Sequence, residues 1–139
     1  MRRLALLMAV ALGGCSSDLA TFSDQSEIRA RWEAQNVYPQ HYKDDLLAYM
    51  RVYLNNPNGV RDAGLTPPQL RPVGPGDRYV ACVRYNARDS DGKYAGVKEG
   101  AAVYVSGKLD QFIDRPRQVR DICKDAAYAP FPELGRLSR

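Results

Sequence analysis

The residues best suited to covalent chemistry are three cysteines, Cys15, Cys82 and Cys123. A thiol can be acylated, oxidised to a disulfide or bound to a metal, and its surroundings decide which of these occurs. The single histidine, His41, has no partner at a recognised catalytic or metal-binding spacing. The sequence also has no G-x-S-x-G, H-E-x-x-H or glycine-rich phosphate motif. We therefore predict that the protein is not an enzyme and has no metal or cofactor; an activity would need a carboxylate pair or a Lys/Ser arrangement.

Cys15 ends a segment that has the layout of a secretory signal. Two arginines precede an apolar run at residues 4–12, which is far shorter than the roughly 20 residues that span a bilayer. The run ends in Leu12-Gly13-Gly14-Cys15, which resembles the lipobox of bacterial lipoproteins, a leucine and two small residues before an invariant cysteine. The alternative is an ordinary signal peptide in which the cysteine stands by chance.

A lipobox implies that the chain is cleaved before Cys15, that the Cys15 thiol carries diacylglycerol and that the new amino terminus is acylated, for example with palmitate. Residues 1–14 are then a signal peptide, residues 15–23 a lipidated tether, and residues 24–139 a single domain that faces the periplasm. Ser16, by the same resemblance, permits sorting to the outer membrane, which makes the inner membrane the less favoured location. The first expected partner is therefore the membrane, reached through Cys15.

The charge pattern argues against a nucleic-acid partner. The chain has 20 basic and 16 acidic residues, and two of the basic ones, Arg2 and Arg3, would leave with the signal. The remaining opposite charges are interleaved along the sequence and form no basic stripe. The length that remains is that of one modest domain.

Cys82 and Cys123 would face the oxidising side of the inner membrane once the chain is exported. Two thiols in a small exported domain usually pair, so we predict a disulfide between them. Closing the long loop between the two cysteines would stabilise the fold by roughly 4 kcal/mol on the chain-entropy model. The alternatives are two free buried thiols, or a metal-binding pair that would lack the four clustered ligands of structural zinc.

Two helices are predicted in the first half of the domain. Residues 24–27, Asp-Gln-Ser-Glu, form a capping box, so a helix should start near Ser26 and place Ile28 and Trp32 on one face. A second helix should open at residues 43–45, whose acidic side chains suit a first turn, and end at residues 55–59. Its apolar stripe consists of Leu46, Leu47, Met50, Tyr53 and Leu54.

The second half of the domain has the pattern of an antiparallel sheet. Residues 60–75 contain four prolines and should form a surface connection with an interrupted edge strand at most. Residues 78–88 alternate as a central strand, and a turn at residues 89–92 leads to strands near 101–105 and 109–113. A last helix after Asp114 would hold Cys123 against the strand that bears Cys82. The predicted fold is α+β, a small antiparallel sheet with a three-stranded meander and room for a further edge strand, packed against two or three helices and closed by one disulfide.

Three apolar residues are candidates for contact with a partner. Trp32 is one of two large apolar residues of the first predicted helix, and Phe131 and Leu134 lie in a proline-rich tail at residues 128–134. Burial inside the domain is the competing expectation for all three. If exposed, they would form apolar surface that a protein or a lipid covers.

The mature chain resembles small envelope lipoproteins of Gram-negative alphaproteobacteria in residues 55–63, 78–96, 108–112 and 126–134. That resemblance implies a grouping and no activity. The sequence as a whole predicts a non-enzymatic, lipid-anchored cell-envelope protein that serves envelope assembly or integrity through protein contacts. The alternative is a binder or inhibitor of a soluble periplasmic ligand, such as a lysozyme-like hydrolase or peptidoglycan.

Overall fold

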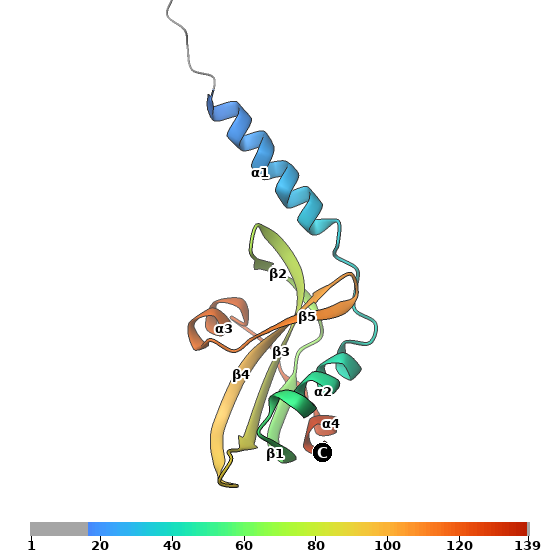
Figure 1. Cartoon of the computed structure of the whole chain (residues 1–139), viewed down its shortest axis with the longest axis vertical. Helices are drawn as coiled ribbons and strands as arrows, with labels where there is room; N and C mark the ends of the chain where they lie inside the picture. Colours follow the sequence, from blue (N-terminus) through green and yellow to red (C-terminus); the bar gives the residue numbers. More distant parts are fainter. Residues whose placement is uncertain (1–16, 139) are drawn as a thin grey trace, which may run out of the picture.

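The computed structural model describes residues 17–138, with side chains from residue 24 onward. The body is a six-stranded antiparallel sheet with helices on both faces, and a long helix projects from one end (Figure 1). The predicted α+β class is confirmed, with more strands and helices than expected. In chain order the elements are α1 (Ser17–Glu33), α2 (Tyr42–Tyr53), β1 (Asn56–Leu65), β2 (Gln69–Val73), β3 (Gly76–Arg88), β4 (Tyr94–Val105), β5 (Lys108–Ile113), α3 (Pro116–Ile122), β6 (Ala129–Pro130) and α4 (Pro132–Gly135).

β3 is the central strand of the sheet. β4 pairs along one side of it, while β1 and β2 share the other side, so the order is β5-β4-β3-β1-β6 with β2 beside the first half of β3. Successive side chains of β3 enter two separate clusters, with Ala81 and Val83 on one face and Val80 and Cys82 on the other. The predicted alternation and the β3-β4-β5 meander are therefore confirmed.

The face of the sheet that carries Ala81 and Val83, called here the α2 face, is covered by α2 and α4. Leu46 and Met50 of α2 are fully buried there, as the apolar stripe predicted. The other buried members of this cluster come from the sheet, from the residue after α2 and from the C-terminal tail. They are Leu54, Val60, Leu65, Tyr85, Ala102, Tyr104, Phe131, Leu134 and Leu137.

The opposite face, called the α3 face, is covered over a smaller area. Helix α3 has seven residues, and Val119 is the one that it buries. Cys123, which follows α3, forms a disulfide with Cys82 of β3, with an S–S distance of 2.09 Å and a Cα–Cα distance of 5.9 Å. The predicted pairing is confirmed, and it fixes α3 to the centre of the sheet.

β1 differs most from the sequence-based prediction, which ended a helix at residues 55–59 and placed after it a surface connection with an interrupted edge strand at most. The structure has instead a ten-residue strand between β3 and β6. The register of β1 shifts twice between residues 56 and 64, and Gly59 and Asp62 take positive φ values of 70° and 54° there. Bulges of this kind let turn-type residues stay within a strand. β2, by contrast, is the marginal strand that the prolines predicted.

α1 spans Ser17–Glu33, so the predicted start near Ser26 is wrong. The helix already includes the residues before the capping box, so residues 24–27 lie in its interior. The side chains of residues 24–31 are all exposed. α1 projects from the body as a stalk, and its C-terminal end meets the start of β3 (Figure 1). Within residues 17–138 no helix is long and apolar enough to cross a membrane.

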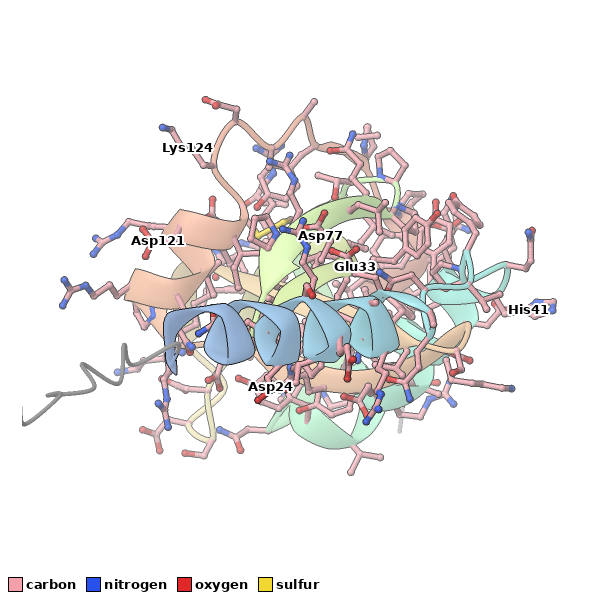
Figure 2. All side chains as sticks on the ribbon, turned by 90° about the horizontal axis from the view of Figure 1, so that it is seen from above. Asp24, Glu33, His41, Asp77, Asp121 and Lys124 are labelled. Carbon is pink, nitrogen blue, oxygen red and sulfur yellow. A yellow bond between two sulfur atoms is a disulfide. The ribbon has the colours of Figure 1, made fainter. Side chains whose placement is uncertain are left out.

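The end of the stalk is fixed by polar contacts and one stacked pair. The guanidinium of buried Arg78 lies 3.7 Å from the centroid of the Trp32 ring and donates a hydrogen bond to the Trp32 backbone oxygen. Arg78 also donates to the side-chain oxygen of Gln35 at 3.0 Å. Glu33 accepts from the backbone N–H of Asp77 at 3.3 Å, and these two labelled side chains lie next to each other in Figure 2. The stalk therefore ends in a specific joint with β3.

Candidate functional site

A groove lies on the α2 face, where α2 ends and the sheet continues past it. It consists of two adjoining hollows of about 230 Å³ and about 360 Å³. Both hollows are lined by Tyr53, Tyr85 and Lys98, and Asp114 lines the larger one. We call this feature the tyrosine groove and define it by these four residues.

Each residue of the tyrosine groove comes from a different part of the chain. Tyr53 is the last residue of α2, and Asp114 directly follows β5. Tyr85 and Lys98 are direct partners in the β3-β4 register. Paired residues in an antiparallel sheet project from the same face as neighbours, so the register sets Lys98 beside the Tyr85 ring.

An aromatic wall supports the groove. The Phe112 ring lies across the sheet over Gly100, where an added Cβ would come within 2.2 Å of Phe112 Cζ. From there the Phe112 ring centroid is 5.2 Å from that of Tyr49 and 5.1 Å from that of Tyr53. Tyr49 and Tyr53 are stacked on each other at 5.4 Å. The absence of a side chain at Gly100 thus allows the ring contacts that hold Tyr53 in place.

The phenol groups of the groove stay neutral. The Tyr53 hydroxyl donates a hydrogen bond of 2.7 Å to Asp114 Oδ2. Burial raises the pKa of Tyr53 far above its usual range, and the hydrogen bond to Asp114 adds to that shift. Burial also raises the pKa of Tyr85 and of Tyr49. Near neutral pH these groups can donate and accept hydrogen bonds, but they cannot act as bases.

The chemistry of the groove is that of reversible binding. Lys98 offers an ammonium group, Asp114 offers a carboxylate, and the tyrosine rings offer apolar surface. Asn55 adds a side-chain amide at the other end. Hollows with a few convergent polar groups and aromatic walls suit a small polar ligand or a short segment of a polymer.

The residues singled out by sequence lie elsewhere. Cys15 is outside the described residues, so its lipidation remains a prediction. Cys82 and Cys123 lie on the opposite face of the sheet from the groove. Trp32 is partly buried, with Arg78 stacked on its ring and Gly74 against its edge. It serves the joint of the stalk, while the part of it that remains accessible borders a shallow hollow beside β5.

Two of the predicted contact residues do not form surface. Phe131 is 1% exposed and Leu134 is 0% exposed. Both pack in the cluster that includes Leu46 of α2 and Leu65 of β1. The proline-rich tail is held in place because β6 pairs with the end of β1 and the Phe131 N–H donates to the Ala63 backbone oxygen at 2.9 Å. The prediction that Phe131 and Leu134 are exposed to a partner is therefore wrong, and the competing prediction of burial is confirmed.

His41 lies exposed at the edge of the molecule, at the start of α2 (Figure 2). Among the side chains of residues 24–138, no three histidine, cysteine, aspartate or glutamate groups are placed to hold a metal ion.

Sequence reasoning missed the tyrosine groove. The periodicity places Tyr53 in the apolar stripe of the second helix and Tyr85 within the alternating strand at residues 78–88, while Asp114 precedes the last predicted helix. The strand register that places Lys98 opposite Tyr85 is not visible in the local pattern, although the polar Lys98 at a position facing α2 is a usable signal once the register is known. Comparisons of the chain with protein-family models, with curated proteins and with solved structures find no match.

Proposed function

We propose that this protein is a lipid-anchored cell-envelope protein that is not an enzyme and that serves envelope assembly or integrity through contacts with another protein. The observation that carries the proposal is the disulfide between Cys82 and Cys123, because such bonds form and persist outside the reducing cytoplasm. The lipobox that ends in Cys15 supplies a matching route of export. Ser16 favours the outer membrane, facing the periplasm.

The stalk supports an anchored role for the body. α1 has 17 residues, which corresponds to a length of about 25 Å at the usual helical rise. It begins two residues after Cys15 and ends in the joint with β3. A lipid on Cys15 would then be connected to the sheet by a helix rather than by an extended tether, and the body would be held away from the bilayer.

The anchor is tested by mass spectrometry on protein purified from native membranes. We expect an amino-terminal peptide that begins at Cys15 and carries the mass of diacylglycerol and a further acyl chain. Cys15→Ser should move the protein to the soluble periplasmic fraction, while the Cys82→Ser/Cys123→Ser double variant should stay in the membrane. An unmodified amino terminus, or one that begins at another residue, would contradict the proposal.

The partner is tested by crosslinking in intact envelopes followed by mass spectrometry. We expect the same membrane or cell-wall protein to be recovered in repeated experiments, through crosslinks on the sheet or its loops. Crosslinks confined to the stalk would indicate proximity without docking. Repeated recovery of no specific protein would count against a role in contacts.

A second candidate function, binding of a periplasmic ligand, is favoured by the tyrosine groove alone. Sedimentation with purified peptidoglycan tests it directly, because the first function predicts no retention. Retention should fall for Lys98→Gln and Asp114→Asn, while Lys108→Gln and Asp110→Asn make the same chemical changes on exposed positions of β5 and should not affect it. Absence of retention removes peptidoglycan as the ligand.

A further inference from the structure

The α3 face extends beyond the area that α3 covers, and its uncovered part is rich in arginine. Arg84 of β3 and Arg61 of β1 are exposed, and Arg88 at the end of β3 is partly buried. By register Arg61 pairs with Asn86, and Arg88 pairs with Tyr94 of β4. Because alternate residues share a face, these positions lie on the side of Val80 and Cys82. We call this surface the arginine face and define it by Arg61, Arg84, Arg88, Tyr94 and Tyr128.

Each guanidinium of the arginine face lies over a tyrosine ring. The Arg61 and Arg88 guanidinium carbons are 4.0 Å and 5.1 Å from the centroid of the Tyr94 ring. The Arg84 guanidinium carbon is 5.0 Å from the centroid of the Tyr128 ring. Stacking of this kind uses the π face of the guanidinium and leaves its N–H groups available for other acceptors.

Glycines and hydrogen bonds hold the two tyrosine-arginine groups flat on the sheet. An added Cβ at Gly64 would lie 2.9 Å from Arg84 Nε and 3.2 Å from Tyr128 Cβ, so the Arg84 side chain crosses β1 where no side chain stands. The Tyr94 hydroxyl donates to the Gly59 backbone oxygen at 2.7 Å and thereby spans from β4 to β1. The arginines are thus positioned by the sheet rather than left to move freely.

The arginines of this face form no ion pair with the carboxylates of residues 24–138, although Glu99 stands on the same face. Among the side chains of residues 24–138, the ion pairs that form are both within α1. Glu99 is opposite Arg84 in the register, yet it makes no ion pair with it. The Arg88 Nε is buried without a hydrogen-bond partner. Three fixed positive charges with unused donors are complementary to a set of carboxylates.

We propose that the arginine face is the docking surface for an acidic segment of a partner protein. This inference rests on the proposed function, because it names the surface and the chemistry of the protein contact. Arginine and tyrosine are the residue types that dominate binding energy at protein interfaces. Val97 of β4, which is 58% exposed, adds apolar surface at a position that pairs with Asn86.

The position of the face argues against the anchoring bilayer as its ligand. α1 leaves the body at one end, while β3 and β4 carry Arg88 and Tyr94 to the opposite end (Figure 1). A bilayer at the start of the stalk would therefore be far from the arginines. The face is an open strand surface, which fits an extended segment better than a single small anion.

The inference is tested with fluorescent twelve-residue peptides of alternating glutamate and alanine, with lysine and glutamine versions as probes of charge. The protein is purified from membranes in detergent with its disulfide intact, and binding is measured by fluorescence anisotropy at several salt concentrations. We expect the glutamate peptide alone to bind, with affinity that falls as salt rises. Arg84→Gln and Arg61→Gln should each weaken binding about five- to tenfold. Arg51→Gln on α2 and Arg117→Gln on α3 remove the same charge from exposed positions outside the face and should leave the affinity unchanged.

A charge reversal makes the test sharper. The Arg61→Glu/Arg84→Glu variant should lose the glutamate peptide and gain the lysine peptide, with its melting temperature measured to show that it is folded. Equal losses for face and control variants would reduce the effect to net charge and overturn the inference, as would absence of binding. Binding of anionic vesicles or peptidoglycan that depends on the same arginines, without binding of the glutamate peptide, would assign the face to another ligand. The peptide assay does not depend on the lipid of Cys15, so failure of the anchor and failure of the face can be told apart.

Discussion

On the α2 face of the sheet, two helices bury a large apolar cluster that includes Phe131, Leu46 and Leu134. On the α3 face, one short helix buries Val119 and partly buries Ile122, and the Cys82–Cys123 bond adds a covalent attachment. The first face is held mainly by the packing of its many apolar side chains, to which hydrogen bonds such as that from Tyr53 to Asp114 add. The second is too small to be held in this way, so a covalent bond between β3 and α3 takes the place of apolar area.

The uncovered parts of the two faces also differ. The uncovered part of the α2 face carries neutral phenol groups and charges of both signs around Tyr53 and Lys98. The uncovered part of the α3 face carries guanidinium groups that are stacked on the rings of Tyr94 and Tyr128. One sheet therefore presents a hollow with hydrogen-bonding groups on one side and a flat positive surface on the other. Changes to each face should affect stability and binding separately.

The largest expected effect is on the packed face. Phe131→Ala removes an aromatic ring that is 1% exposed, so the free energy of unfolding should fall by about 3–5 kcal/mol. Urea denaturation under oxidising conditions measures it. Leu70→Ala, at a position that is 49% exposed on β2, is the control and should change the free energy by less than about 0.5 kcal/mol. A loss below about 1 kcal/mol for Phe131→Ala would show that packing does not hold this face.

Removal of the disulfide should have the next largest effect on the free energy of unfolding, and the accompanying loss of local protection should be greatest on the other face. The Cys82→Ser/Cys123→Ser variant should lose about 2–4 kcal/mol, because the bond closes a loop with a sequence separation of 41. Hydrogen exchange should become faster in α3 and remain slow in α2 at Leu46 and Met50. Equal loss of protection in both helices would mean that the two faces unfold as one unit.

The sequence could predict those parts of the fold that depend on local periodicity. The alternation around Val80 and Ala81 and the stripe through Leu46 and Met50 are each visible within about a dozen residues. β1 was missed because its turn-type residues are absorbed by bulges whose cause is pairing with β3. The start of α1 was missed because a capping box is a short motif that also fits the interior of a helix.

Both binding surfaces depend on which residues meet across strands, and local pattern does not contain that information. Lys98 meets Tyr85 through the β3-β4 register, and Arg84 crosses Gly64 through the β1-β3 register. The disulfide was predictable for a different reason, since only two cysteines remain once Cys15 is assigned to the lipobox. Counting cysteines was enough to predict the disulfide, while the tyrosine groove and the arginine face can be recognised only once the fold is known.

A smaller effect is expected at the edge of the packed face. In Gly100→Ala the new methyl would lie 2.2 Å from Phe112 Cζ, so the ring must leave its place against Tyr49 and Tyr53. Overpacking of this kind should cost about 1–3 kcal/mol, measured by urea denaturation. Gly100→Ala/Phe112→Leu should recover part of the loss. If the double variant is no better than the single one, the ring is not the obstacle.

The smallest stability effect is expected within the groove, and it carries a pH signature. Tyr53→Phe removes the hydrogen bond to Asp114 and should cost about 0.5–1.5 kcal/mol at pH 7. Burial raises the pKa of Tyr53. The folded state therefore keeps the proton of the Tyr53 hydroxyl at about pH 10, where the unfolded state begins to lose it. The unfolded state then binds fewer protons, so the stability that the neutral phenol contributes is complete below that pH and is lost as the pH rises. Melting temperatures measured from pH 7 to pH 11 should fall less steeply for Tyr53→Phe than for the wild type.

Asp114→Asn separates the two causes of that shift. The amide oxygen still accepts the Tyr53 hydrogen bond, and burial, the larger cause of the raised pKa, is unchanged. The variant should therefore keep most of the alkaline slope, while its stability at pH 7 should fall less than that of Tyr53→Phe. If Asp114→Asn instead abolished the slope, the carboxylate rather than burial would be what holds the Tyr53 proton. The stability of the α2 face would then depend on the charge of Asp114 at its edge. The two faces would differ less, because charge would matter to both.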